Sequence, residues 1–527
     1  MRSLADIETD IVIVGAGHNG LVAATLLARA GLAVEVLEAA DVVGGACRTE
    51  RPFVKAPELA ASTGAYLLGL MPPELIATLG IDLPLVRRDP HYFLPTLDGR
   101  HLLLGGDRDR SRALFAEFFS EADARADEAL AAEVGALRDD LAPAWLTEPL
   151  PVEDTAERYI RPALRQVFVD LVRGSAMDYL ARFGFASEMV LAMYAVTDGM
   201  PGLTGSPWSP GSGHNFLVHN MCRLPGSGGT WMAVRGGMGA VTQTLAAAAA
   251  ASGATIRTAC PVASITLSGA AAAGVVTDTG EEIAAPVVLC CTDAFRIPGL
   301  LRGHAPAALV DRVAEWAERS PGQTMKINLA LSGLPRFAAL PDRRGQHGTT
   351  VHLLPPAAAD GSVLTALRVA FDAAAAGSLA AVPPLEWYLH STLDPSMRDA
   401  AGNHSSALFV QGVPHEPAGS SWAGEKPGYV ERLLDIVESY APGVRDSLVD
   451  VDALTPPEIR EHFGITSSNI HHVDNAISFT DRMPYAVGVD GVYAGAAGCF
   501  PAGSVIGCAG HNAARRILAD LSVRRTA

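Results

Sequence analysis

The sequence lacks the cysteine patterns of a metal site or a redox disulfide. No two cysteines are spaced as a CxxC pair, and none combines with histidine at the spacing of zinc ligands. The odd number of cysteines fits a reducing compartment. We therefore expect no metal centre and a cytoplasmic protein. The seven residues are scattered as Cys47, Cys222, Cys260, Cys290, Cys291, Cys499 and Cys508.

Dense positive charge is also missing. Lys and Arg total 40 against 57 Asp and Glu, which gives a formal net charge of −17, and no run rich in Lys or Arg interrupts this balance. Contacts to a phosphate backbone need clustered cations. We therefore expect no nucleic-acid partner.

Long apolar runs are absent as well. The richest, residues 246–251, consists of six alanines and is too short and too weakly hydrophobic to cross a membrane. The start, MRSLADIETD, has acidic residues where a signal or transit sequence needs basic ones. Residues 66–71 (YLLGLM) could form a lipid-facing entrance or part of the core. We expect no integral membrane segment, and peripheral membrane contact stays open.

What the sequence does contain is enough apolar material for a large core. Hydrophobic residues make up 49% and charged residues 18% of the 527 residues. Disordered chains have less hydrophobicity and more unbalanced charge. The length predicts about three domain-sized units, at roughly 100–200 residues each.

The first forty residues carry the pattern of a βαβ unit. Residues 10–14 (DIVIV) predict a strand, and residues 15–20 (GAGHNG) predict the following turn. Residues 21–30 have the composition of a helix, and residues 33–37 (AVEVL) predict a second strand. This order and spacing are typical of a dinucleotide-binding site.

Each glycine of the turn has a separate role in such a site. Gly15 permits the tight turn, Gly17 lets the backbone approach a pyrophosphate at the helix N-terminus, and Gly20 lets helix and strand pack closely. Glu38 follows the second strand, where its carboxylate can accept both ribose hydroxyls. Because that carboxylate would repel a 2′-phosphate, NADP is disfavoured here.

The residues after the second strand decide between dinucleotides. Gly44 and Gly45, followed by Arg48 and Thr49, resemble the second FAD-contact motif of glutathione-reductase-type flavoproteins, particularly their amine-oxidase and phytoene-desaturase branch. Disulfide reductases carry a redox cysteine pair shortly after this motif, whereas here only Cys47 is present. No second GxGxxG follows in a strand-turn-helix context, so the sequence favours FAD and indicates no NAD(P)H domain.

Two middle segments are expected to belong to the same unit. A glycine cluster at residues 236–239 precedes an expected helix over 241–252 and an alternating strand over 255–265. That strand includes Val262, whose backbone would pair with the adenine edge in a flavoprotein of this type. Residues 285–291 predict a strand ending at Thr292, similar to the strand that passes beneath the cofactor in this fold.

The C-terminal segment is expected to close over the flavin. A glycine-rich loop leads into a helix through residues 512–518, and its backbone donors can face the flavin N1–C2 carbonyl, where negative charge collects on reduction. Residues of this loop that we expect to contact the cofactor are Gly498, Gly503, Ser504 and Val505.

Further segments extend the resemblance over nearly the whole chain. Together with the FAD motifs, they resemble the phytoene-dehydrogenase-related FAD-dependent oxidoreductases, with the branch of pyridine nucleotide-disulphide oxidoreductase domain-containing proteins as the nearest. The segments include residues 209–211 (SPG), 217–219 (LVH), 326–331 (KINLAL), 392–395 (TLDP) and 469–472 (NIHH).

The resemblance implies an α/β fold with FAD as cofactor. It implies a Rossmann-like FAD-binding domain of the glutathione-reductase, amine-oxidase and phytoene-desaturase type, with an inserted α+β substrate domain. One departure stands in the C-terminal motif, where relatives usually have His-Pro-Gly-Gly-Gly and this chain has residues 500–504 (FPAGS). We expect the FAD domain to comprise residues 1–105, 228–300 and 466–527, and the substrate domain residues 106–227 and 301–465.

Histidines near the flavin motifs are the candidate catalytic groups, because losing a proton beside a departing hydride suits an imidazole near neutral pH. His219 matches a histidine of the family, His214 follows a glycine in a loop-like stretch, and His471 and His472 precede the final FAD segment. Trp231 and Arg235 could wall the pocket or pin a substrate carboxylate. Tyr388, His390 and Asp394 form a polar cluster whose position the sequence does not give.

The expected function is that of an FAD-dependent dehydrogenase, desaturase or oxidase. It would take a hydride from a C–C or C–N bond of a small or medium organic substrate, possibly apolar, with oxygen or a quinone as acceptor. Two alternatives remain open. One is a redox-neutral, flavin-dependent double-bond isomerase, and the other is an FAD-containing protein that binds partners without turnover.

Overall fold

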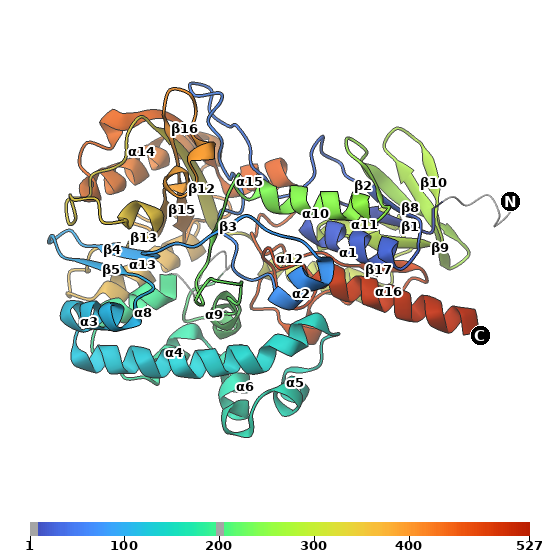
Figure 1. The fold of residues 1–527 in the computed structure, drawn as a ribbon, viewed down its shortest axis with the longest axis horizontal. Coiled ribbons are helices and arrows are strands. Elements are labelled where there is room, and N and C mark those ends of the chain that lie inside the picture. Colours follow the sequence, from blue (N-terminus) through green and yellow to red (C-terminus); the bar gives the residue numbers. More distant parts are fainter. Residues whose placement is uncertain (1–8, 197–204, 527) are drawn as a thin grey trace.

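Two large β-sheets, side by side, form the centre of the molecule (Figure 1). The computed structural model describes residues 9–196 and 205–526. The first eight residues, which carry part of the expectation that no leader sequence is present, lie outside the described residues. Both described ends of the chain lie beside the smaller of the two large sheets.

The five-stranded sheet is parallel throughout. The βαβ pattern folds as predicted, with β1 at Ile11–Val14, α1 at His18–Arg29 and β2 at Val34–Leu37. All four β1 side chains are buried, as expected for a central parallel strand with both faces covered. The strand order is β17-β11-β1-β2-β7, where the remaining strands are β7 (Thr255–Arg257), β11 (Val287–Cys290) and β17 (Val492–Ala494).

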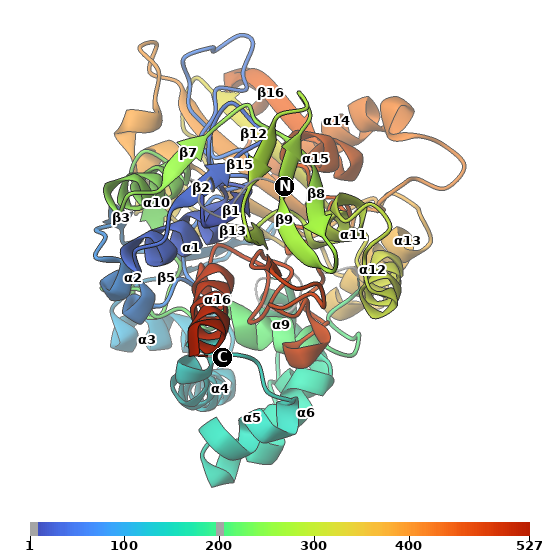
Figure 2. The ribbon, with the colours of Figure 1, turned by 90° about the vertical axis from the view of Figure 1, so that its right-hand side faces the viewer.

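Two helices from distant parts of the sequence pack against α1. They are α10 (Gly239–Ala251) and α16 (Cys508–Thr526), and Figure 2 shows them on either side of α1. The C-terminal helix therefore joins the N-terminal βαβ unit. Gly510 allows this close approach, because a Cβ there would lie 1.9 Å from the carbonyl oxygen of Asn19.

The single strand expected over residues 255–265 is wrong. The structure forms β7 and then β8 (Val262–Ser268), which pairs in a separate three-stranded antiparallel sheet with β9 (Ala271–Thr277) and β10 (Glu282–Ala284). The chain changes direction at Ala259, which has a φ of 50°, and Pro261 has no N–H to donate to a ladder. The alternation of side chains continues across this break, which is why the pattern predicted one strand.

The seven-stranded sheet is mixed, with the order β16-β12-β15-β14-β13-β4-β5. Only the β13–β4 pair is parallel among these neighbours. The strands are β4 (Tyr92–Pro95), β5 (His101–Leu104), β12 (Thr324–Leu331), β13 (Thr350–Leu353), β14 (Leu385–Tyr388), β15 (His404–Gln411) and β16 (Leu448–Leu454). The division of the chain into five segments stays a prediction, and the pairing of β4 and β5 favours ending the first segment before residue 92.

Helices cover the sheets and form a separate layer along one side of the molecule (Figure 1). That layer includes α3 (Arg108–Phe118), α4 (Glu121–Leu141), α5 (Val152–Tyr159), α6 (Arg165–Arg173), α7 (Ala176–Ala181), α8 (Glu188–Tyr194) and α9 (Ser212–His219). The other helices are α2 (Pro73–Leu79), α11 (Ile297–Leu300), α12 (Ala307–Arg319), α13 (Val363–Ala375), α14 (Trp422–Tyr440) and α15 (Pro456–Phe463).

No helix within residues 9–196 and 205–526 combines the length and the apolar character needed to cross a bilayer. In the run at residues 66–71, Leu67, Leu68, Leu70 and Met71 are buried. This burial favours the core interpretation of the run over a lipid-facing entrance.

Candidate active site

A cavity of about 820 Å³ connects the two large sheets. Its lining includes Val14, Leu37 and Cys291, at the carboxyl ends of parallel strands, and Lys326 and Tyr388 from the seven-stranded sheet. Ligands of open α/β sheets bind at this edge of the strands, and the volume lies in the range of about 300–1,000 Å³ found for ligand pockets. The cavity thus spans the expected nucleotide and substrate sides.

The predicted glycines take different positions at the first end. Gly15 lines the cavity with a φ of 105°, and a Cβ there would lie 2.9 Å from the Cys291 carbonyl oxygen. Gly17 also lines the cavity, and a Cβ would meet nothing within 4 Å. Gly20 lies outside the lining and packs α1 against the turn, since its Cβ would lie 2.1 Å from the Gly15 oxygen. Gly17 leaves open space directly before the N-terminus of α1, where backbone N–H groups favour an anion.

Glu38 also lines this end and is buried. Its two carboxylate oxygens accept the backbone N–H groups of Ala16 at 2.7 Å and Ala40 at 3.0 Å. These bonds fix the carboxylate at the end of β2 while leaving further acceptor sites on both oxygens. Val262, at the start of β8, lines the same end of the cavity.

The central part of the cavity brings together most of the other residues predicted to bind the cofactor. Besides Gly20, two predicted residues lie outside the lining: a Cβ on Gly498 would lie 2.8 Å from Ala294 Cβ, and one on Gly503 would lie 2.1 Å from the His471 oxygen. These two glycines therefore shape the C-terminal loop through close packing. Those in the lining are Gly44, Gly45, Arg48, Thr292, Ser504 and Val505.

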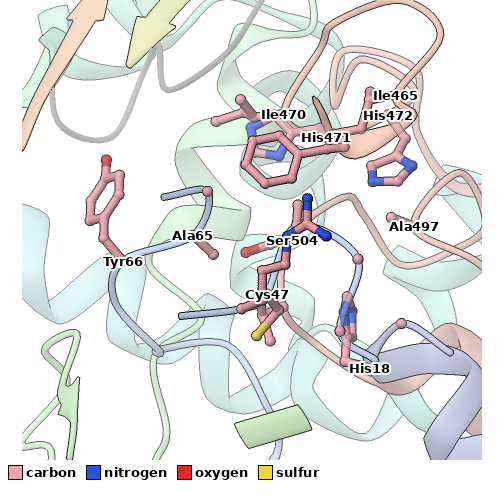
Figure 3. A pocket seen from close by; sticks show the side chains of 18 of the residues that line it. His18, Cys47, Ala65, Tyr66, Ile465, Ile470, His471, His472, Ala497 and Ser504 are labelled. Atoms are coloured by element: carbon pink, nitrogen blue, oxygen red, sulfur yellow. The ribbon is translucent and has the colours of Figure 1, made fainter. Parts of the chain in front are cut away.

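His18, His472 and Asp293 form a polar group in this central part, in which Asp293 is buried and the two histidines are half-buried. Figure 3 shows His472 and His18 on opposite sides of the cavity. Burial, and then the neighbouring His472, lower the pKa of His18 to about 4, and burial also lowers the pKa of His472. Nε2 of His18, Nδ1 of His472 and Oδ1 of Asp293 are buried without a hydrogen-bond partner. Nδ1 of His472 and Oδ1 of Asp293 lie 3.8 Å apart, an ion pair when His472 is protonated. Buried polar atoms without a hydrogen bond favour a polar ligand at that position.

The four histidines predicted as catalytic separate into two groups. His219, His471 and His472 line the cavity. His219 stacks on Trp231 with 4.7 Å between ring centroids, and Nδ1 of His471 lies 2.9 Å from the Gly503 oxygen. His214 does not line the cavity. It lies in helix α9 instead of the expected loop, with Nδ1 2.6 Å from the Asn475 oxygen, and this position does not support the predicted catalytic role.

Sequence reasoning gave no role to Lys326, which occupies the far end of the cavity. Its side chain is buried, and Nζ lies 4.0 Å from the centroid of the Tyr66 ring and 3.5 Å from the Gly64 oxygen. Burial lowers the pKa of Lys326 to about 7, although Glu386 and Asp452 act in the opposite direction. A lysine with such a pKa can hold or release a proton near neutrality.

Glu386 organises the polar groups around this lysine. It accepts the Tyr388 hydroxyl and, at 3.1 Å, Nε2 of Gln411, while the Tyr66 hydroxyl lies 3.5 Å away. Tyr66 and Tyr388 lie with their ring centroids 4.4 Å apart. A signal was present in the sequence, since Lys326 and Glu386 are charged residues inside short apolar strands.

Comparisons with known proteins agree with this geometry. The sequence model of the family described as "Flavin containing amine oxidoreductase" matches residues 20–298, which is more than half of the chain. The chain belongs to this family. Within the flavin containing amine oxidoreductases and their relatives, it is 33% identical to pyridine nucleotide-disulfide oxidoreductase domain-containing protein 2 of Mus musculus, over 98% of this chain and 94% of that protein.

A further relative agrees with the family assignment, and a solved structure shows the same fold. Hydroxyneurosporene desaturase of Rubrivivax gelatinosus is 27% identical over 62% of this chain and 61% of that protein. The solved structure of cyclohexylamine oxidase from Brevibacterium oxydans has the same fold, with a TM-score of 0.56 at 15% identity, covering 98% of this chain and 100% of that chain.

These findings confirm the predicted family resemblance, the α/β Rossmann-like fold and FAD as the cofactor. The protein is an FAD-dependent oxidoreductase. The cavity fits that cofactor, because open space at Gly17 precedes a helix N-terminus and buried atoms of His18, Asp293 and His472 that lack a hydrogen bond face the central part. Residue by residue, the cofactor contacts predicted from the sequence stay a proposal.

Cys47 is the cysteine through which disulfide chemistry could contribute to the reaction, and its reactivity can be measured. Burial raises the pKa of its thiol to about 12, so about one molecule in ten thousand carries the thiolate at pH 8. We expect Cys47 in the folded protein to resist iodoacetamide and Cys47→Ser to retain flavin reduction within about threefold, since serine is close in size. Peptide mass spectrometry measures the labelling, with urea-unfolded protein as the control. Rapid labelling of folded protein, or loss of reduction in the variant, would contradict this expectation.

Proposed function

We propose that the protein removes a hydride from a C–C or C–N bond of an organic substrate held between Lys326 and the central part of the cavity. Oxygen or a quinone would be the final electron acceptor. The observation that carries this proposal is Lys326, a buried amine in the cavity wall with a pKa lowered to about 7. It supplies a proton acceptor where the oxidised bond needs one.

The residues around Lys326 would each have a separate role in this reaction. Bound FAD would supply the hydride acceptor. The neutral amine of Lys326 accepts the proton that leaves the substrate, so that one hydride and one proton together account for the two electrons and two hydrogens removed. The Tyr66 and Tyr388 rings wall the substrate, and Glu386 holds the Tyr388 hydroxyl. Burial of Lys326, Tyr388 and Glu386 excludes water, which strengthens their electrostatic interactions.

Anaerobic reduction of the holoenzyme tests the proposal. A panel of primary amines, secondary amines and allylic hydrocarbons is mixed with oxidised holoenzyme, and the visible flavin band is followed. We expect at least one class to bleach the band with one equivalent of oxidised product per flavin, and admission of oxygen or a soluble quinone to restore it. Product analysis by mass spectrometry should show the loss of two hydrogens.

The same experiment separates the two alternatives. An isomerase converts many equivalents of substrate anaerobically without an added acceptor, and its product has the mass of the substrate. A protein that acts by binding partners never loses its oxidised band with any member of the panel. Either result would overturn the proposed net oxidation.

A further inference from the structure

Arg88 is a buried cation in the cavity wall with no acidic partner. Its side chain is 5% exposed, Nε donates to the Trp231 oxygen at 2.9 Å, and Nη1 donates to Thr350 Oγ1 at 2.8 Å. Within residues 9–196 and 205–526, no carboxylate forms an ion pair with Arg88 and no hydrogen bond engages Nη2. A buried charge without a partner is costly, and guanidinium groups remain charged in proteins.

The acidic groups described around this end of the cavity do not pair with Arg88. Glu386 is the nearby acid, and the hydroxyl of Tyr388 and the amide of Gln411 already donate to it. Burial and then Arg88 lower the pKa of His91 to about 4, so this imidazole is neutral at pH 7. Glu386 and Asp452 both act on Lys326, whereas Glu386 acts on Arg88 without forming an ion pair with it. An anionic ligand in contact with Arg88 would offset its buried charge.

A smaller pocket on the surface adjoins the large cavity. It has a volume of about 330 Å³ and shares Cys222 and Gly229 with the large cavity. Three arginines line it, namely Arg108, Arg138 and Arg223. Arg138 pairs with Asp139 and Arg223 with Glu74, so one cation remains in excess in a chain whose net charge is −17. A locally positive entrance on an acidic protein attracts anions.

We propose that the substrate is an organic carboxylate with an apolar body, which enters past these arginines and is held by Arg88. One N–H of Nη1 donates to Thr350, so Nη2 and the second N–H of Nη1 would offer two donors side by side to a planar carboxylate. Apolar walls for the body come from Leu67, Met193, Phe409 and Trp231. This inference rests on the proposed function for the identity of the bound molecule as a substrate, whereas the binding itself can be measured without turnover.

A matched pair of ligands tests the charge requirement in the wild-type holoenzyme. Titration calorimetry compares 3-phenylpropanoate with 3-phenylpropanamide, which has nearly the same shape and no charge. We expect the carboxylate to bind at least roughly tenfold more tightly, because a hydrogen bond to a charged group contributes more than a neutral one. Equal affinities for the acid and the amide would overturn the proposal.

Two variants with the same change of charge locate the effect. In Arg88→Gln, we expect the dissociation constant of 3-phenylpropanoate to rise roughly 10- to 100-fold and that of the amide to stay within about threefold. Arg235→Gln is the control, because Arg235 is exposed, lies outside the cavity lining and was a carboxylate candidate in the sequence. Equal weakening by the two variants would contradict a specific role of Arg88.

Folding and entry are checked separately. If Arg88→Gln does not fold, Arg88→Lys takes its place, because lysine retains the charge. We expect this variant to bind the acid more tightly than the amide. Loss of that preference in a folded Arg88→Lys protein with bound FAD would count against the site. In Arg108→Gln/Arg138→Gln, we expect slower association of the carboxylate at low salt and unchanged dissociation in stopped-flow mixing. An unchanged association rate would remove the entrance from the proposal.

The outcomes distinguish this inference from the proposed function. Carboxylate binding that depends on Arg88, with no flavin reduction by any carboxylate or amine, would keep the inference about the anion site and overturn the redox function. Reduction by a neutral or cationic substrate, with no preference for acid over amide, would keep the function and overturn the anion site.

Discussion

Replacing Gly17 by leucine is expected to leave the protein folded and to abolish tight FAD binding. Gly17 has φ −70° and ψ 170°, which any residue adopts, and a Cβ there would meet no atom within 4 Å. The new side chain would instead enter the cavity before the N-terminus of α1, where we place the pyrophosphate. We expect FAD affinity to fall more than about 100-fold, measured by quenching of flavin fluorescence, because the leucine and the phosphates compete for one space.

Gly333→Leu is the matched control. Gly333 also has open space around its Cβ position and no positive φ, but it lies outside the cavity lining. We expect this variant to purify yellow with unchanged FAD affinity. The apo form of Gly17→Leu should unfold within about 1 kcal/mol of the wild type, since only a helix N-cap preference changes. Tight FAD binding by a folded Gly17→Leu protein would rule out this placement of the pyrophosphate.

The nucleotide end of the cavity was predictable because its determinants are local in sequence. β1, the glycine turn, α1 and β2 lie within about thirty residues, and the φ of 105° at Gly15 is a conformation that glycine adopts readily. The position of Glu38 was predictable as well, because it is the first residue after β2. The sequence predicted one strand where the structure has β7 and β8, because side chains can alternate in the same way when the chain leaves one sheet for another. Pro261 was a signal against one continuous strand, since it has no N–H to donate to a ladder.

The substrate end was not predictable, because it is assembled from residues far apart in the chain. Lys326 lies in β12 and Glu386 in β14, which the strand order of the seven-stranded sheet brings together. Arg88 follows β3 (Leu85–Val86), which belongs to a separate two-stranded sheet, and reaches the same end through its bond to Thr350 in β13. Histidine was therefore favoured as a base on chemistry alone. His214 shows the limit of that argument, since burial in α9 and a bond to the Asn475 oxygen give it a structural position.

Lys326→Met is expected to lower kcat by roughly 100- to 10,000-fold on any substrate that reduces the wild-type flavin. Methionine retains the length of the apolar stem but cannot accept a proton. Because the pKa of Lys326 is lowered to about 7, the neutral amine forms as the pH rises, and wild-type kcat/KM should rise through pH 7 to a plateau. Rapid-reaction measurements of flavin reduction between pH 5 and 9 should show this rise, and the methionine variant should lack it.

Lys326→Arg separates the proton acceptor from a mere positive charge. Arginine stays protonated, so we expect it to be as slow as methionine if the amine acts as a base. Stability gives a check that needs no substrate: the folded protein binds fewer protons than the unfolded chain between the lowered pKa of about 7 and the usual 10.5. The unfolding free energy of the wild type relative to Lys326→Met should therefore fall as the pH drops from 10.5 to 7. If kcat/KM of the methionine variant rises through pH 7 as in the wild type, Lys326 is not the base. If the difference in unfolding free energy between the two proteins does not change with pH, the pKa of Lys326 is not lowered.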